Sequence, residues 1–155
     1  MVQTERVDAG RRTVVYTDGA CHGNPGPGGW AWATGPDRYA AGAEALTTNQ
    51  RMELTAVIEA VTHHPGPLEI VSDSAYVVNC FKDRWWQGWE RRNWLNTQRK
   101  PVANRDLWEE LFALALDANR DIHFSWVKGH SGDAMNDFVD VLATEAADTQ
   151  RGRHS

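Results

Sequence analysis

The chain has 155 residues, a net charge of −5 and eight Trp, an unusually high number in an otherwise ordinary composition. This length suffices for a single domain with a substantial core. No apolar run approaches the roughly 18 residues of a membrane span, and the first residues lack the apolar core of an export signal. Cys21 and Cys80 lack metal-site spacing. We therefore expect a single-domain protein located in the cytoplasm, with no membrane partner.

The first part of the chain predicts three consecutive strands. Residues 1–11 are polar, and we expect them to be disordered. A run of β-branched and aromatic residues predicts a strand over 12–17, and alternation of large and small side chains predicts a second over 29–34. A third, over 38–46, follows the turn Gly35-Pro36-Asp37. These strands are expected to form an antiparallel meander.

A loop rich in glycine and proline, from Gly19 to Gly29, separates the first two strands, and Asp18 stands just before it. Glycine allows backbone to approach a ligand closely. Asp18 is therefore either a solvated residue that starts a turn or a carboxylate delivered to a binding site.

A helix is predicted over 49–63, with Thr48 or Asn49 as its cap. Its apolar residues recur with helical spacing and form a buried stripe. Glu53 lies beside this stripe in the first turn. It either complements the helix dipole or contributes to a site.

A short strand over 68–72 ends at Asp73, and the next helix begins at about Ser74. Because a helix between two strands favours a right-handed crossover, this strand should run parallel to the first. Asp18 and Asp73 would then meet at the carboxyl edge of the sheet, where ligands bind in open α/β folds. Asp73 is either a helix cap or a partner of Asp18, and two adjacent carboxylates call for a cation.

Residues 82–105 form a basic arm, with seven Lys and Arg against two acids. The arm carries +5, so the remainder of the chain carries −10. This asymmetry indicates a polyanionic partner. The arm also holds four Trp, which either pack one side of a small helix or stack on a sugar or base; they are Trp85, Trp86, Trp89 and Trp94.

The last part of the chain predicts a helix over 107–115, a strand over 122–127 and a flexible loop over 128–132. A closing helix follows, with Asp140 one residue away from its apolar side. Residues 149–155 are expected to form a mobile tail.

The four acids and their neighbours resemble ribonuclease HI, the type 1 RNase H family, in its bacterial form with a basic protrusion. Seven stretches carry the resemblance in one order through about residues 13–147. They are Tyr16-Thr17-Asp18-Gly19, Gly23-Asn24-Pro25-Gly26-Pro27-Gly28-Gly29, Thr47-Thr48-Asn49-Gln50-Arg51-Met52-Glu53-Leu54, Ser72-Asp73-Ser74, Lys100-Pro101-Val102, Asp106-Leu107-Trp108 and Trp126-Val127-Lys128-Gly129-His130.

The resemblance implies an α/β, ribonuclease H-like fold with a mixed five-stranded sheet, three strands antiparallel and the others parallel, flanked by helices. It implies one domain over 12–148, with 82–105 as its protrusion. The implied activity is endonucleolytic hydrolysis of the RNA strand of RNA–DNA hybrids, giving 5′-phosphate products. Two Mg²⁺ ions are the implied cofactors, with Mn²⁺ as an alternative, and the protein is expected to be a monomer.

The resemblance also assigns residues. The metal-binding set is Asp18, Glu53, Asp73 and Asp140, and His130 matches the mobile catalytic histidine. The substrate-binding residues are Cys21, Asn24, Thr48, Asn49 and Gln50 near the acids, and Trp85, Arg91, Arg92, Trp94, Arg99 and Lys100 on the arm.

Two positions depart from the family pattern. Ala75 stands where many bacterial members carry Gln, which removes one expected groove contact. Residues 136–141 differ from the usual run around Asp140. The alternatives are an inactive nucleic-acid-binding module and another nuclease or strand-transfer enzyme of the same fold.

Overall fold

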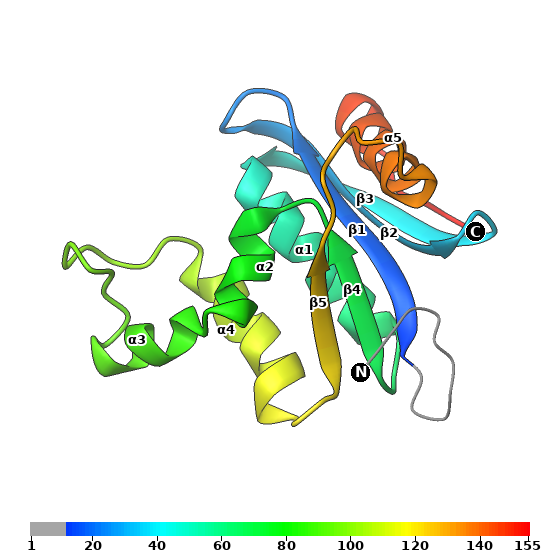
Figure 1. The fold of residues 1–155 in the computed structure, drawn as a ribbon. Coiled ribbons are helices and arrows are strands. Elements are labelled where there is room, and N and C mark those ends of the chain that lie inside the picture. Colours follow the sequence, from blue (N-terminus) through cyan, green and yellow to red (C-terminus); the bar gives the residue numbers. More distant parts are fainter. Residues whose placement is uncertain (1–11) are drawn as a thin grey trace.

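The computed structural model describes residues 12–155, so the expected disorder of residues 1–11 falls outside the described residues. Figure 1 shows a twisted sheet with helices on both faces and an arm that projects to one side. The strand order is β5-β4-β1-β2-β3-β6. The strands are β1 Thr13–Cys21, β2 Gly26–Gly35, β3 Arg38–Thr47, β4 Leu68–Ser72, β5 Ile122–Trp126 and β6 Arg153–His154.

Strands β1, β2 and β3 pair antiparallel, whereas β4 pairs parallel with both β1 and β5. This arrangement confirms the predicted meander, the crossover and the mixed α/β class. The first strand is longer than predicted, because β2 continues the ladder until Cys21 pairs with Gly28. Asp18 therefore lies within β1, opposite Ala31, rather than after its end.

The helices are α1 Asn49–His63, α2 Ala75–Lys82, α3 Trp85–Arg91, α4 Arg105–Phe112 and α5 Ala134–Thr149, and a π-helical turn over Ala113–Asp117 extends α4. Side-chain oxygens cap three of them: Thr48 accepts from Arg51 N, Ser74 from Val77 N, and Asp133 from Met135 N and Asn136 N. Capping satisfies backbone donors that a helix start leaves open.

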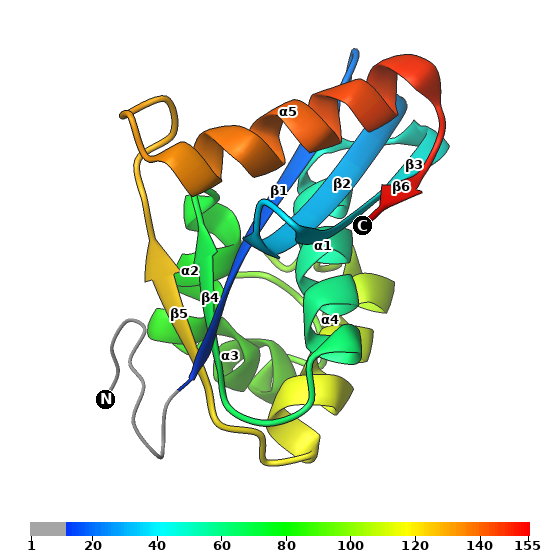
Figure 2. The same cartoon turned by 90° about the vertical axis from the view of Figure 1, so that its right-hand side faces the viewer.

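Two cores lie on opposite faces of the sheet. Figure 2 shows α5 crossing β1 and β2 on one face and α1 on the other. The α1 face holds the larger core, which includes Leu54 and Trp108, and the α5 face is lined mainly by small residues such as Ala31 and Ala143. A Cβ at Gly29 would lie 2.3 Å from Ala143 O, so the glycine permits α5 to pack this closely.

The sheet has one strand more than predicted, because part of the expected mobile tail forms β6. Arg153 and His154 pair with Ala41 and Ala40 of β3. Ser155 N donates to Tyr39 O at 3.0 Å, a normal hydrogen-bond length. A strand of two residues is too short to show the alternation of side chains by which strands are predicted. It forms because the edge of β3 offers backbone groups for pairing.

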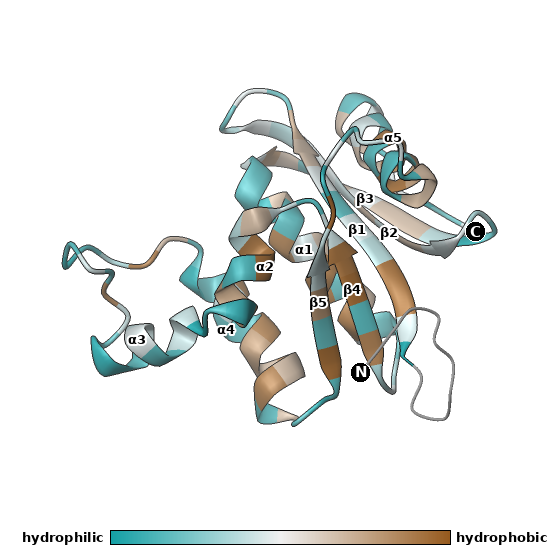
Figure 3. Cartoon of the chain, viewed as in Figure 1, coloured by the Kyte–Doolittle hydropathy of each residue, from teal (hydrophilic) through white to brown (hydrophobic). Residues whose placement is uncertain are grey.

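The arm and the sheet differ in polarity. Figure 3 shows hydrophobic colouring on β4 and β5, whereas α3 and the loop after it are mostly hydrophilic or neutral.

Within residues 12–155, none of the helices combines the length and apolar character needed to cross a bilayer.

Candidate active site

Three acids from distant parts of the chain meet where the parallel pairing of β1 and β4 ends. Asp18 comes from β1, Glu53 from the start of α1, and Asp73 from the residue after β4. Each offers a carboxylate oxygen, and these oxygens all lie within 4.8 Å of one another. Asp18 is only 3% exposed and Glu53 6%, while Asp73 is half-buried. We call these residues the acidic cluster.

Close packing of α1 against β1 brings the first two acids together. A Cβ at Gly19 would lie 2.5 Å from the backbone nitrogen of Glu53 and 2.5 Å from the carbonyl carbon of Met52. Such distances are below van der Waals contact, so only glycine fits between the strand and the helix. The amide of Gly19 also donates to Asp18 Oδ1 at 2.9 Å.

Burial raises the pKa of every carboxyl in the acidic cluster, and repulsion between these carboxyls adds to the rise for Asp18 and Glu53. Burial, followed by the charge of Asp73, raises the pKa of Asp18 from 3.8 to about 8. Burial and then Asp18 raise the pKa of Glu53 well above its ordinary value. Burial also raises the pKa of Asp73. Removing water from like charges disfavours their ionised form, so the cluster without a cation retains protons near neutral pH.

The acidic cluster fits a hard divalent cation. Glu53 Oε1 is buried and has no hydrogen-bond partner within the protein, which is costly for a carboxylate oxygen. A cation would satisfy it and lower the repulsion. The donors are all carboxylates, the ligand type that Mg²⁺ prefers. Across residues 12–155, no other group of three His, Cys, Asp or Glu side chains is gathered in this way.

Asp140 and Asn136 approach the acidic cluster from α5. Asp140 is outside the 4.8 Å group, yet it interacts with Asp18 and contributes to the rise in that carboxyl's pKa. Asn136 is 1% exposed, and its hydrogen bond to Asp73 acts to lower the pKa of Asp73. Asn136 is not among the predicted site residues, although its spacing of one helical turn from Asp140 places both on one face of α5.

His130 lies on the loop that passes beside Asp73. Its side chain is exposed, and its electrostatic effect acts to lower the pKa of Asp73. A Cβ at Gly129 would lie 2.9 Å from Asp73 Oδ2, so glycine allows the loop to approach. His130 itself has φ of 56°, an uncommon conformation for a non-glycine residue.

The loop between β1 and β2 is tied to the start of α1. Asn24 Oδ1 accepts from Asn49 N at 2.9 Å, and Cys21 Sγ donates to the carbonyls of Gly26 and Thr47 at 3.5 and 3.4 Å. Asn49 and Gln50 have exposed side chains. The predicted substrate residues near the cluster are thus held together on one surface.

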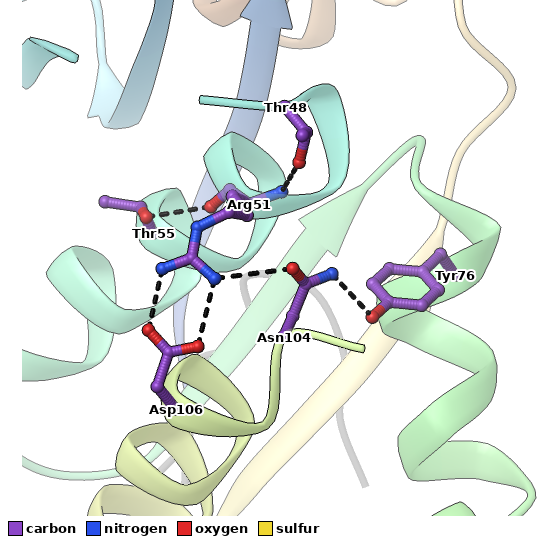
Figure 4. Close-up of polar contacts among 6 residues, drawn as sticks. All are labelled: Thr48, Arg51, Thr55, Tyr76, Asn104 and Asp106. Atoms are coloured by element: carbon purple, nitrogen blue, oxygen red, sulfur yellow. Dashed lines mark hydrogen bonds and ion pairs between the residues drawn. The ribbon is translucent and has the colours of Figure 1, made fainter. Parts of the chain in front are cut away.

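A polar bridge joins α1 to the base of the arm (Figure 4). Arg51 donates to both carboxylate oxygens of Asp106, at 2.9 and 2.7 Å, and to Asn104 Oδ1 at 3.4 Å. Asn104 in turn donates to the hydroxyl of Tyr76 at 3.2 Å. The bridge connects the residues that follow Thr48 with α4 and α2, so it fixes the arm's base relative to the acidic cluster.

The arm combines packed aromatic rings with exposed charges. Trp89 is 9% exposed, and Trp94 lies against it with ring centroids 5.6 Å apart. Trp85 and Trp94 are half-buried, so packing accounts for part of each. Arg92 Nε donates to Leu95 O at 3.0 Å and supports the arm's own fold. The exposed cations of the predicted set are Arg91, Arg99 and Lys100.

Comparison with known proteins agrees with this geometry. The family model described as RNase H matches residues 10–148. A ribonuclease H of Pelobacter propionicus is 48% identical over 143 residues, 89% of this chain and 86% of the relative. That of Erythrobacter litoralis is 43% identical over 145 residues, 90% of this chain and 99% of the relative.

Solved structures show the same fold. A crystal structure of LC9-RNase H1, described as a type 1 RNase H with the type 2 active-site motif, matches with a TM-score of 0.75 at 30% identity, covering 92% of this chain and 76% of that chain. A foamy viral protease-reverse transcriptase matches with a TM-score of 0.73 at 22% identity, covering 93% of this chain and 99% of that chain. The second likeness concerns the fold alone.

Fold, acidic cluster and relatives together define a nuclease class, the endoribonucleases of the RNase H type. The chain belongs to the ribonuclease H family.

Proposed function

We propose that the protein is a Mg²⁺-dependent endonuclease that hydrolyses the RNA strand of RNA–DNA hybrids. The observation that carries this proposal is the convergence of Asp18, Glu53 and Asp73 within 4.8 Å. Three buried or half-buried carboxylates gathered this closely serve a cation far better than they serve the stability of the fold. The family membership supports the choice of a phosphodiester as substrate.

The proposed metal ligands are Asp18, Glu53, Asp73 and Asp140. When bound, a pair of Mg²⁺ ions would supply Lewis-acid stabilisation of the attacking and leaving oxygens of the phosphodiester. Asn136 fixes the carboxyl of Asp73 through its hydrogen bond. Exposed on a loop beside Asp73, His130 is proposed to move a proton or to assist product release.

Recognition of the hybrid is proposed to use two surfaces. Asn24, Asn49 and Gln50 present polar groups beside the acidic cluster, where they suit 2′-hydroxyls and base edges in a wide, shallow minor groove. Thr48 suits a backbone phosphate. The arm's exposed cations suit phosphates of the hybrid, and its half-buried Trp85 and Trp94 offer aromatic faces.

A gel assay tests the proposal. Labelled RNA–DNA hybrid, duplex DNA and duplex RNA are each incubated with Mg²⁺, Mn²⁺ or EDTA. We expect cleavage of the RNA strand of the hybrid only, with a divalent cation and not with EDTA. Hybrid binding without cleavage would identify an inactive binding module instead. Cleavage of duplex DNA would identify another nuclease of this fold.

A further inference from the structure

A groove of about 650 Å³ runs along edge strand β5, outside the acidic cluster. Aromatic rings form much of its wall. Phe81 of α2 and Phe124 of β5 both line it, and their rings stack with centroids 4.0 Å apart. Trp86 continues this wall, 5.8 Å from Phe81. The packing of these rings makes the groove a preformed feature.

The groove reaches the active site through Trp126, the last residue of β5. Trp126 lines the groove and is 53% exposed, one of three large hydrophobic residues that are exposed among residues 12–155. Its indole N–H donates to the backbone oxygen of Asp73 at 3.1 Å. The ring is therefore held at the border between the groove and the acidic cluster, with one side available to a ligand.

The charged residues that line the groove are cations. Lys82 and Arg84 are both exposed and lie among the lining residues, which include no acid. Glu69 on the neighbouring strand β4 carries a carboxylate but does not line the groove. It accepts a hydrogen bond from Ser125 Oγ at 2.7 Å. Cations beside aromatic faces are the recurring composition of surfaces that bind single-stranded nucleic acid, with phosphates on the cations and bases on the rings.

We propose that this groove binds a single-stranded segment that continues from the hybrid past Trp126. The inference rests on the proposed function and extends its substrate from a plain hybrid to a hybrid joined to a single strand. The groove's size supports one strand, because volumes of roughly 300–1,000 Å³ hold ligands of drug size rather than a double helix. The first unpaired base stacks on Trp126, and the following phosphates meet Lys82 and Arg84.

Fluorescence anisotropy in EDTA measures the binding directly. The probes are one blunt hybrid and four hybrids with a single-stranded extension, on the RNA or the DNA strand and at the 5′ or 3′ end. At least one extension should tighten binding by about 5-fold or more, the lower bound for stacking one base on an aromatic ring. The identity of that extension shows which strand enters the groove. Equal affinity for all five hybrids would overturn the proposal.

Two sets of variants assign the gain to the groove. The double variant Lys82→Gln/Arg84→Gln should lose the gain, and its salt slope on the extended hybrid should flatten by roughly 0.7 per lost phosphate contact. Trp126→Phe keeps a ring and should keep most of the gain, whereas Trp126→Ala should lose it. Arg38→Gln, on an exposed cation at the start of β3, is the matched control and should behave as wild type.

Two outcomes of the variant experiments would contradict the proposal that the groove binds a single strand. One is a gain that survives the double variant. The other is an equal loss for blunt and extended hybrids, which would make these cations part of general hybrid contact. The proposed function fails separately, when wild-type protein with Mg²⁺ leaves the blunt hybrid uncleaved.

Discussion

The acidic cluster lies within β1, in the first turn of α1 and directly after β4, with two of its three acids buried, whereas most cations of the arm over 82–105 are exposed. In the first region, like charges removed from water raise one another's pKa and oppose folding until a cation joins them. In the second, charges in water are screened by salt and add little to stability. Changes in the cluster should therefore alter catalysis and stability, and changes on the arm should alter affinity and its salt dependence.

The largest effect is expected for Asp18→Asn. Cleavage should be lost, because a proposed metal ligand is removed, while hybrid binding in EDTA should remain. The metal-free variant should be at least as stable as wild type, since one of several repelling carboxyls has gone. Thermal unfolding in EDTA and a cleavage assay check both points. A variant that melts well below wild type in EDTA would make Asp18 a structural residue; Asp37→Asn, in the exposed β2–β3 turn, is the control.

The pH dependence of stability sharpens this test. The pKa of Asp18 rises from 3.8 to about 8 on folding, so between these values the native protein binds more protons than the unfolded chain. Stability of the metal-free protein should consequently fall as pH increases through that window. Asp18→Asn should flatten the fall. A denaturation series from pH 4 to pH 8 measures it, and equal slopes for both proteins would contradict the assignment.

Gly19→Ala tests how closely α1 must approach β1. A Cβ here would lie 2.5 Å from Glu53 N, so the strand and helix must separate, at a cost of roughly 1–3 kcal/mol for overpacking. Separation would also move Glu53 away from Asp18 and lower kcat. Urea denaturation and kinetics provide the measurements. Gly35→Ala is the matched control, because nothing lies within 4 Å of its Cβ position; equal stability of the two variants would refute the close-packing argument.

His130→Ala should have a smaller effect that is confined to turnover. If His130 moves a proton without holding a metal, kcat should decrease by about 10–100-fold, at the lower end for general acid–base groups. Mg²⁺ and hybrid affinity should stay near wild type. Calorimetric Mg²⁺ titration beside steady-state kinetics separates these quantities. Loss of metal affinity together with a fall in kcat as deep as that of Asp18→Asn would make His130 a ligand or an anchor.

The smallest change in turnover is expected on the arm. Substituting Ala for Arg91, Arg99 and Lys100 should raise KM more than it lowers kcat, and the slope of log K against log salt should flatten by roughly 0.7–0.9 per lost phosphate contact. Arg92 is left unchanged because its guanidinium supports Leu95 O. Binding measured between low and moderate salt tests this. An unchanged slope would mean that the arm's cations only face solvent.

The elements predicted best are those with local signals at both ends. Helix α1 has its cap at Thr48 and a Pro soon after its end, and its predicted bounds match the structure. The end of β1 and the whole of β6 were missed, because each depends on a partner strand distant in sequence. The π-helical turn after α4 was also not predicted, since its residues continue an ordinary helical pattern.

The convergence of Asp18 and Asp73 could be predicted from the parallel pairing of their strands; each acid follows the last parallel pair, Thr17 with Ser72, although β1 itself continues to Cys21. The family resemblance added Glu53 and Asp140. The steric reason for the convergence was not visible, since the crowding of Gly19 against Glu53 N requires coordinates. Asn136 was missed for a similar reason, because only its burial against Asp73 distinguishes it from a surface amide. The roles of His130 and of the substrate residues stay predictions.

The short strand β6 also affects how the protein behaves among copies of itself. An unpaired strand edge is a template for intermolecular pairing and aggregation. Arg153 and His154 occupy part of the β3 edge, and the guanidinium of Arg153 is held there by Glu145 at 2.8 Å and lies over the ring of Tyr39. In the part of the chain that the structure describes, β6 therefore covers the β3 edge at Ala40 and Ala41 and shortens the unpaired edge that another copy could pair with. A segment remote from the acidic cluster thus limits edge-to-edge pairing between copies of the chain.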